Sequence, residues 1–567
     1  MKVKSIKDAV HGYIKLEEPF WKIIDTAEFQ RLKWIEQTSY RVLYPSARHD
    51  RFIHSLGVFH LGKKAIQGFL SNSTDKDKKQ IEKYKNSFLL ACLVHDIGHA
   101  PFSHTCEDLY NYKHKVTEID SYLNKEFLKQ MQEKLSSTDV FSAFSTDYRY
   151  LVSPDGKMPS PHEVMSCILV AQMFDIFSGF FEPKESNLLD LDLIVRSIIG
   201  CCYMVSRRNE YAKNRKIGIK NCLIRLLNSN TVDVDKLDYI ARDTKMTGYD
   251  NIVLDTERLL GSVCMICDNN VFYPAFKKSA LSVINNVVIA KNAQAKWIVN
   301  HPIVMYDSYL LKSAIGQSLK AWAELDEKSS SSGLPEIKNK TYDEFIKRIF
   351  SSAALSRKGI ESIKGQHFSL LSDIEILNLM KSNFCLPGVF EYFARDERKG
   401  PVWKSYEEFL YCLDSDKNKI TKVYDFIVPL ITYLEKIKDI SKRKQIDEKL
   451  YEEINGDDTT EGNSVVLEIL KVFKEYSKSD GVKAEFEYVI LPVNNSFSAK
   501  INPNNLYIRF GEDEKCFATF NSLTVHQSYE SEQIIRFFYL YSKTKIDAKH
   551  FLQYLYTKAE QAEIVRI

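Results

Sequence analysis

Residues 88–104 predict both a buried helix and a cluster of histidines at its end. Their sequence is Phe-Leu-Leu-Ala-Cys-Leu-Val-His-Asp-Ile-Gly-His-Ala-Pro-Phe-Ser-His. The stretch from Ser87 to Asp96 predicts a compact apolar helix that runs directly into His95 and Asp96. The helix is expected to end there, because glycine permits the turn that closes a helix and proline cannot continue one. Three of the 13 histidines of the chain fall within ten residues, so the end of this helix is a candidate site for chemistry.

A metal ion is the ligand that this pattern favours. A His-Asp pair at a helix end offers a nitrogen and an oxygen donor about 100° apart around the helix axis. Because a stable site needs about four ligands, another histidine and another carboxylate are expected on neighbouring helices. His54 interrupts the apolar face of a helix predicted over 52–69, and Asp235 stands where a helix over 232–245 begins. Each residue alone has an ordinary explanation, such as a core histidine, but their combination favours a site.

The composition limits the classes of protein to consider. The chain has 567 residues, 44% of them hydrophobic, which predicts two or three domains with real cores. A net charge of +3 argues against a protein built to coat nucleic acid or an anionic membrane, although a local basic groove stays open. Only 21 glycines and 15 prolines favour helices. The absence of a signal sequence or a long apolar run, and 11 scattered cysteines, predict a cytoplasmic protein.

The pattern along the chain predicts a mainly α fold, with a C-terminal helical region that contains a small β element. The expected regions are a catalytic domain over 1–326 with a polar insertion at 111–160, a helical region over 336–480, and a small α+β region over 481–567. A serine-rich linker at 327–335 closes the first region. One further helix is expected over 280–313, and strands are expected at 485–491 and 505–510.

Five motifs give the chain a resemblance to a known family. Taken in order, they resemble motifs of the HD-domain deoxynucleoside triphosphate triphosphohydrolases, which include bacterial dGTPases and the vertebrate sterile-alpha-motif/HD dNTPase. The resemblance covers roughly residues 5–315, implies an HD-domain helical core, and says little about the last third of the chain. The motifs are Ile24-Asp-Thr-Ala-Glu-Phe-Gln-Arg-Leu32, Tyr44-Pro45, His49-Asp-Arg-Phe-Ile-His-Ser-Leu-Gly57, His95-Asp-Ile-Gly-His-Ala-Pro-Phe-Ser-His104 and Asp233-Val-Asp-Lys-Leu-Asp-Tyr-Ile-Ala-Arg-Asp243.

The resemblance implies a divalent metal centre. The residues that match the family's ligands are His54, His95, Asp96 and Asp235. Mixed imidazole and carboxylate ligation suits Mn, Fe, Zn or Mg, and the ligands alone do not choose among these metals.

The resemblance also implies a set of catalytic residues. His104 matches the general acid near the leaving 5′ oxygen, and Glu107 stands where the family often has an aspartate that orients this acid. His99 matches a second catalytic histidine. His162 resembles a further histidine of the site, but its separation from His104 exceeds the usual spacing, so His114 is a rival for this position.

Phosphate contacts follow from the same resemblance. Arg51 and Lys236 would meet the phosphates, the arginine through its planar fork and the lysine as a point charge. Lys291 stands where an arginine is usual for the terminal phosphates.

The sugar contacts involve the same predicted helix. Lys236, Tyr239 and Asp243 lie at helical spacing on one stripe, for which the alternative explanation is a solvated face. In the family, the tyrosine packs on the sugar, and the matches of Asp243 and Gln37 bind its 3′-hydroxyl. Val299 stands where a tyrosine is expected, which leaves the nucleotide preference open.

The function that the resemblance implies is metal-dependent hydrolysis of dNTPs to a deoxynucleoside and inorganic triphosphate. An HD phosphodiesterase or nuclease that acts on single-stranded nucleic acid or a signalling nucleotide is the alternative, and a non-enzymatic nucleotide sensor is a third. Expected partners are deoxynucleoside triphosphates, further copies of the chain and a nucleotide activator. No membrane is expected, and nucleic acid is not excluded. The cellular role, nucleotide balance or antiviral defence against phage, stays open.

Overall fold

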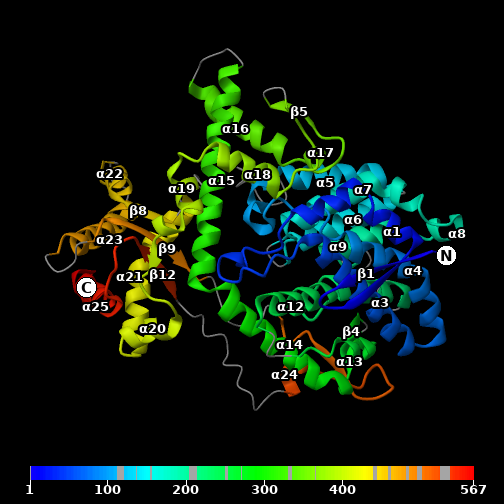
Figure 1. The fold of residues 1–567 in the computed structure, drawn as a ribbon. Coiled ribbons are helices and arrows are strands. Elements are labelled where there is room, and N and C mark those ends of the chain that lie inside the picture. Colours follow the sequence, from blue (N-terminus) through cyan, green and yellow to red (C-terminus); the bar gives the residue numbers. More distant parts are fainter. Residues whose placement is uncertain are drawn as a thin grey trace. The chain divides into compact units, whose positions relative to one another are not determined.

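The structure is a computed structural model that describes most of the chain. The described residues are 2–111, 121–135, 137–153, 156–203, 214–249, 253–269, 271–329, 335–363, 366–437, 444–456, 461–479, 484–493, 501–523 and 537–566. The fold is mainly α, as predicted (Figure 1). None of the described helices is long and apolar enough to cross a membrane.

The chain forms two compact units. Unit 1 consists of Met1–Gln294, Ala323–Ile376 and Ala499–Tyr529, and unit 2 consists of Ala295–Trp322, Leu377–Ser498 and Glu530–Ile567. This division differs from the predicted regions, because two later segments return to the N-terminal unit. One of them adds strands to a sheet of unit 1. The other is held to the first helices by an ion pair between Arg357 and the buried Glu28 and by a hydrogen bond from Arg31 to the Leu371 carbonyl.

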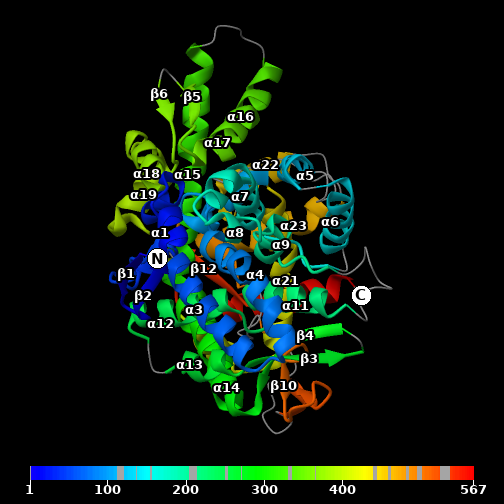
Figure 2. The same cartoon turned by 90° about the vertical axis from the view of Figure 1, so that its right-hand side faces the viewer.

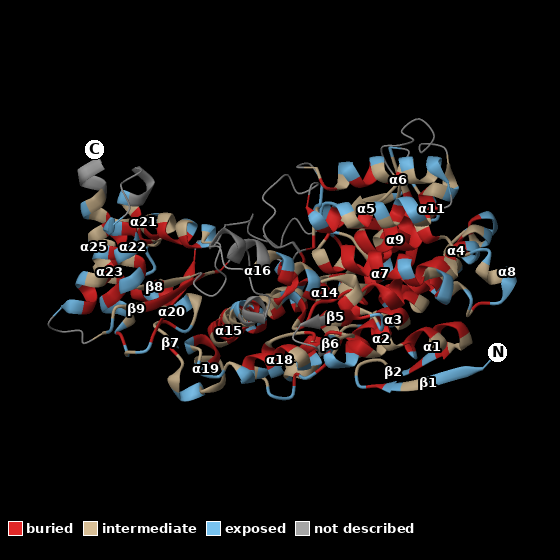
Figure 3. Ribbon diagram, turned by 90° about the horizontal axis from the view of Figure 1, so that it is seen from above, coloured by how far each residue is buried: buried red, intermediate tan, exposed pale blue. Residues whose placement is uncertain are grey.

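The predicted apolar helix lies at the centre of unit 1. It is the C-terminal half of α4 (Asp75–Val94), which packs against α3 (Arg51–Ser71), α9 (Leu191–Ile199) and α11 (Arg215–Leu227). Figure 3 shows the buried faces of α3, α7 and α9 in red. The helix begins well before the predicted start, because the Thr74 hydroxyl accepts a hydrogen bond from the Asp77 backbone N–H and acidic residues occupy the first turn.

Further helices surround this core. The described part of the predicted insertion at 111–160 contains α5 and α6, and α5 packs against α7. The other helices of unit 1 are α1 (Glu18–Ile24), α2 (Ala27–Gln30), α5 (Tyr122–Lys134), α6 (Thr138–Leu151), α7 (Pro161–Ser178), α8 (Pro183–Ser186), α12 (Val234–Thr247), α13 (Thr256–Gly261), α14 (Leu281–Gln294), α16 (Pro335–Ile349), α17 (Ser352–Leu355) and α24 (Phe520–Leu523).

The prediction of a single helix over 280–313 is wrong. This stretch is divided into α14 and α15 (Pro302–Ser329), with a short π-helical turn at Ala295–Val299 between them. Pro302 begins the second helix, since its ring fits the first turn of a helix but blocks the interior.

The strands of unit 1 form small sheets. β1 (Val3–Asp8) and β2 (Gly12–Glu17) make an N-terminal hairpin, and β5 (Ile360–Ile363) pairs with β6 (Gln366–Phe368). A third sheet has the order β11-β10-β4-β3, in which β10 runs parallel to β4 (Figure 2). Its strands are β3 (Val263–Asp268), β4 (Val271–Lys277), β10 (Tyr507–Arg509) and β11 (Phe517–Thr519).

Unit 2 packs its helices around a sheet of order β7-β12-β9-β8. The two strands predicted at 485–491 and 505–510 therefore do not share one β element, because β9 lies here and β10 lies in unit 1. The strands are β7 (Gly400–Pro401), β8 (Gln445–Asp447), β9 (Glu487–Pro492) and β12 (Phe538–Ser542). The remaining helices are α18 (Asp373–Ser382), which begins in unit 1, and α19 (Pro387–Phe393), α20 (Tyr406–Cys412), α21 (Lys417–Lys436), α22 (Glu448–Gly456), α23 (Glu461–Lys478) and α25 (Ala548–Arg566).

Candidate metal centre and active site

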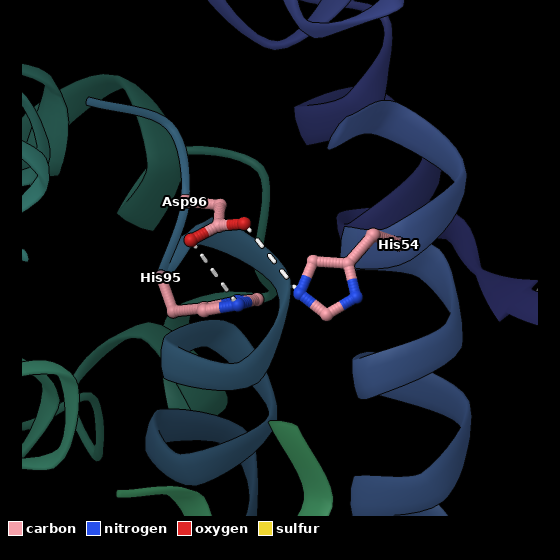
Figure 4. Close-up of side chains that lie close together, drawn as sticks. All are labelled: His54, His95 and Asp96. Carbon is pink, nitrogen blue, oxygen red and sulfur yellow. Dashed lines mark ion pairs between the residues drawn. The ribbon is translucent and has the colours of Figure 1, made fainter. Parts of the chain in front are cut away.

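Three helices bring the predicted metal ligands together. His54 projects from the first turn of α3, His95 and Asp96 follow the last residue of α4, and Asp235 is the second residue of α12. Nε2 of His54 lies 3.5 Å from Oδ2 of Asp96 and 3.1 Å from Oδ1 of Asp235. Nε2 of His95 lies 3.4 Å from Oδ1 of Asp96 (Figure 4). The same nitrogen lies 3.6 Å from Oδ1 of Asp235.

The donor atoms of this cluster fit a divalent cation. Nδ1 of His95 donates a hydrogen bond to the Cys92 carbonyl over 2.9 Å, which leaves Nε2 as the nitrogen that faces the carboxylates. That Nε2 is buried and makes no hydrogen bond to any residue the structure describes. Carboxylates raise the pKa of His54 to about 9 although burial opposes the shift, so the cluster favours positive charge at this position. Two imidazoles and two carboxylates are ligands that Mn, Fe, Zn and Mg all accept in proteins.

A buried network of charged side chains binds the other ring nitrogen of His54, Nδ1. Nδ1 of His54 donates to Oδ2 of Asp238 over 2.7 Å, and Nε2 of His11 donates to the other oxygen over 2.6 Å. Arg242 binds both oxygens of Asp238 at 2.9 Å and Asp8 at 2.8 Å. A hydrogen bond on Nδ1 fixes the orientation of a ligating histidine and leaves Nε2 for the metal.

Sequence reasoning missed this network. Asp238 and Arg242 lie four residues apart in a quoted motif, a spacing that permits an ion pair on one helix face. The contact of Asp8 and His11 with α12 has no local signal, because it joins the N-terminal hairpin to a helix more than 220 residues later.

Glu107 joins two of the predicted catalytic histidines. Its Oε2 accepts a hydrogen bond from Nδ1 of His104 over 2.7 Å, and its Oε1 accepts one from Nδ1 of His162 over 2.6 Å. His162 reaches this point from the second position of α7, where Ser160 and Glu163 form a capping box. Burial would raise the pKa of Glu107, but the two histidines lower it, so the carboxylate stays ionised. The rival His114 lies outside the described residues.

His99 and His104 differ in exposure. The His99 side chain is fully buried, its Nε2 lies 3.2 Å from Oδ1 of Asp96, and its ring stacks on His162 at 4.0 Å between centroids. Burial and the charge of Arg51 hold the pKa of His99 well below its usual value, so this imidazole is neutral. The His104 side chain is 65% exposed, and its Nε2 lies 3.5 Å from Nη2 of Arg51.

The predicted phosphate-binding residues make contacts within the protein. Arg51 donates to Oδ2 of Asp96 over 2.8 Å and to the Ser103 hydroxyl over 2.9 Å. Nζ of Lys236 donates to Oδ2 of Asp233 over 2.5 Å and to the Ser229 carbonyl over 2.8 Å. Both cations therefore already bind groups of the protein, although neither side chain has used all of its N–H donors in these bonds.

Lys291 lies over the Tyr239 ring and is linked through Gln294 to Asp243. Nζ of Lys291 lies 4.3 Å from the centre of the Tyr239 ring and donates to Oε1 of Gln294 over 2.9 Å. Gln294 in turn donates to Oδ2 of Asp243 over 2.5 Å, and His49 binds Oδ1 over 2.8 Å. Sequence reasoning gave no role to His49 or Gln294.

Gln37 has free bonding capacity. Its side chain is buried, and Oε1 has no hydrogen-bond partner in the described part of the chain. A buried acceptor without a partner is unfavourable, so a hydroxyl donor from a ligand would satisfy it.

Comparison with known proteins finds an HD domain in this part of the chain. The HD domain family matches residues 51–145, which contain three of the four predicted ligand residues. The uncharacterized protein MJ1154 of Methanocaldococcus jannaschii is 26% identical over 314 residues, 55% of this chain and 49% of that protein. The deoxynucleoside triphosphate triphosphohydrolase SAMHD1 of Gallus gallus is 28% identical over 262 residues, 44% of this chain and 35% of that protein. The chain thus spans about half the length, or less, of these relatives.

A solved structure shares the fold. The crystal structure of a hypothetical protein from Aquifex aeolicus has a TM-score of 0.50 and 15% sequence identity, and the likeness covers 99% of both chains. Residues 51–145 of the chain thus match the HD domain, and the chain is similar to deoxynucleoside triphosphate triphosphohydrolases.

Proposed function

We propose that this chain is a metal-dependent phosphohydrolase that converts dNTPs to a deoxynucleoside and inorganic triphosphate. One observation carries the proposal: imidazole nitrogens of four histidines lie 3.2–3.9 Å from the carboxylate of Asp96. Such a cluster of buried titratable groups supports phosphoester hydrolysis, and the similarity to the deoxynucleoside triphosphate triphosphohydrolase SAMHD1 supports a dNTP as the substrate.

A divalent metal held by His54, His95, Asp96 and Asp235 would polarise a phosphate oxygen and lower the pKa of water. The reaction adds the oxygen of water to the α-phosphorus and breaks the bond from this phosphorus to the 5′ oxygen. His104, oriented by Glu107, is placed to give the leaving 5′ oxygen its proton. Lys291 and Lys236 would balance the charge of the triphosphate, and Gln37 would accept the hydrogen bond of a sugar hydroxyl.

The test is a product analysis with a panel of dNTPs, NTPs and single-stranded oligonucleotides in the presence of Mn, Fe, Zn or Mg. The proposal expects equal amounts of deoxynucleoside and triphosphate. In water labelled with ¹⁸O, the label should enter the triphosphate, because water attacks phosphorus and not carbon. Release of a monophosphate with pyrophosphate would show cleavage of the bond between the α- and β-phosphates and would contradict the proposal. Cleavage of oligonucleotides alone would instead identify an HD phosphodiesterase or nuclease.

A further inference from the structure

The loop at residues 97–104 carries His99 and His104 in an unusual backbone conformation. Phe102 and Ser103 both have positive φ, of 54° and 51°. Side chains other than glycine rarely adopt this left-handed conformation, so the surrounding structure must hold it in place. The origin of that support decides where the two histidines lie.

Asp373, the first residue of α18, supplies part of this support. Its Oδ1 accepts a hydrogen bond from the Phe102 backbone N–H over 2.6 Å, and its Oδ2 accepts one from the Glu36 backbone N–H over 2.8 Å. The side chain is only 5% exposed, and its burial raises the pKa to about 7 although both hydrogen bonds oppose the shift. One buried carboxylate thus bridges the loop that holds His104 and the segment that leads into Gln37.

Ser103 and Arg31 make further hydrogen bonds that hold the 97–104 loop in the same place. The Ser103 hydroxyl donates to the Glu36 carbonyl over 2.6 Å, which gives the two loops a second connection. Arg31 donates to the carbonyls of Ile97 at 2.8 Å and His99 at 3.0 Å, and with its other nitrogen to the Leu371 carbonyl at 2.8 Å. The segment at 371–373 is therefore linked to the loop directly at Phe102, and through Arg31 at Ile97 and His99.

We infer that Asp373 is a positioning residue: its carboxylate fixes the 97–104 loop against residues 36–37, so that His104 and Gln37 face the same substrate. The inference rests on the proposed function for its catalytic consequence, but its structural content is independent of the substrate. It gives a role in the site to a segment that lies more than 200 residues beyond the matched HD domain.

Asp373→Asn is the direct test, because an amide keeps the size of the side chain but presents an NH₂ group to one of the two backbone N–H donors. We expect kcat to fall about 10- to 100-fold, as for a displaced catalytic group, with KM changed less than about threefold. The amount of bound metal should not change, since Asp373 touches none of the four ligand residues. Ser103→Ala, which removes the second connection, should lower kcat in the same direction.

Glu28→Gln is the matched control. Glu28 ties the same part of the chain to α2 by binding the Arg357 side chain at 2.9 and 3.0 Å and its backbone N–H at 3.1 Å, and it contacts neither loop. The control should lose thermal stability while kcat stays within about twofold of the wild-type value. A control that lost as much kcat as Asp373→Asn would reduce the role of Asp373 to general stability and overturn the inference.

Amide hydrogen exchange separates this inference from the proposed function. In Asp373→Asn, exchange at residues 35–37 and 97–104 should become faster than in the wild-type protein, with or without a substrate. If the wild-type protein does not hydrolyse dNTPs but exchange in Asp373→Asn rises as expected, the proposed function fails. The role of Asp373 in fixing the 97–104 loop against residues 36–37 then remains. Unchanged exchange in a folded Asp373→Asn protein, or loss of bound metal equal to its loss of kcat, would overturn the inference.

Discussion

Replacing Gly57 with alanine tests whether the buried network behind His54 supports the metal centre. Gly57 lies almost one helical turn after His54 in α3. A Cβ atom at this position would lie 1.8 Å from Oδ1 of Asp238 and 2.6 Å from Nη2 of Arg242. Both of these side chains are fully buried and bind each other, so neither has free space in which to move.

The expected loss in the free energy of unfolding follows from the ion pair between Asp238 and Arg242, which the added methyl group would disrupt. Disrupting a buried ion pair costs about 3–5 kcal/mol, and alanine regains about 1 kcal/mol over glycine inside a helix. The free energy of unfolding should therefore fall by about 2–4 kcal/mol. Because Asp238 also orients His54, we expect metal affinity to fall about 10- to 100-fold.

Urea unfolding of the metal-free protein and a metal titration measure the two effects separately. Gly261→Ala is the control, since a Cβ there would meet no atom within 4 Å. The control should match the wild-type protein in metal affinity and should be no less stable, because alanine gains up to about 1 kcal/mol over glycine in a helix. If Gly57→Ala changed the free energy of unfolding by less than about 0.5 kcal/mol and left metal affinity intact, the assigned role of the network would be refuted.

Four further outcomes are expected. His95→Ala should lose bound metal and hydrolysis together, whereas His104→Ala should keep the metal and lose about 10²- to 10⁴-fold in rate; equal metal loss would move His104 among the ligands. Asp243→Ala should depress kcat/KM on dNTPs strongly, while Tyr239→Ala should relax the preference for deoxyribose by no more than about 10²-fold in competition assays. Light scattering during turnover should show a dimer or a larger symmetric oligomer, and a monomer would contradict this. Burial raises the pKa of Asp373 to about 7, so the free energy of unfolding should fall as pH rises from about 4 to 7. Urea unfolding of Asp373→Asn should show a smaller fall over this pH range. An equal fall in the variant would assign the pH dependence to other groups.

The helices that carry the site were accessible to sequence reasoning because their apolar residues are periodic. The helix predicted over 52–69 corresponds to α3, and the apolar run at Ser87 lies in α4. The start of α4 was not accessible, since its first turns are almost entirely polar and depend on the cap at Thr74. Local pattern thus identified buried helix segments better than helix ends.

The contacts of the site were harder to predict than its residues. The motifs brought His104 and Glu107 to attention, and the structure adds their hydrogen bond. They did not reveal that Gln294 and His49 occupy both oxygens of Asp243, because this contact depends on how α12 and α14 pack. The role of Asp373 could not be predicted from the sequence either, because no local pattern around it indicates a contact with Phe102.

The pairing of β10 with β4 has a consequence for how the protein is made. Tyr507 lies opposite Ala275, so more than 200 residues must be translated between the two strands. At about 5–20 residues per second, a ribosome would leave the edge of β4 without its partner for roughly 10 seconds or longer. An uncovered edge strand invites pairing with other chains. At this edge, newly made protein is thus vulnerable to aggregation from the time β4 emerges until β10 has been made.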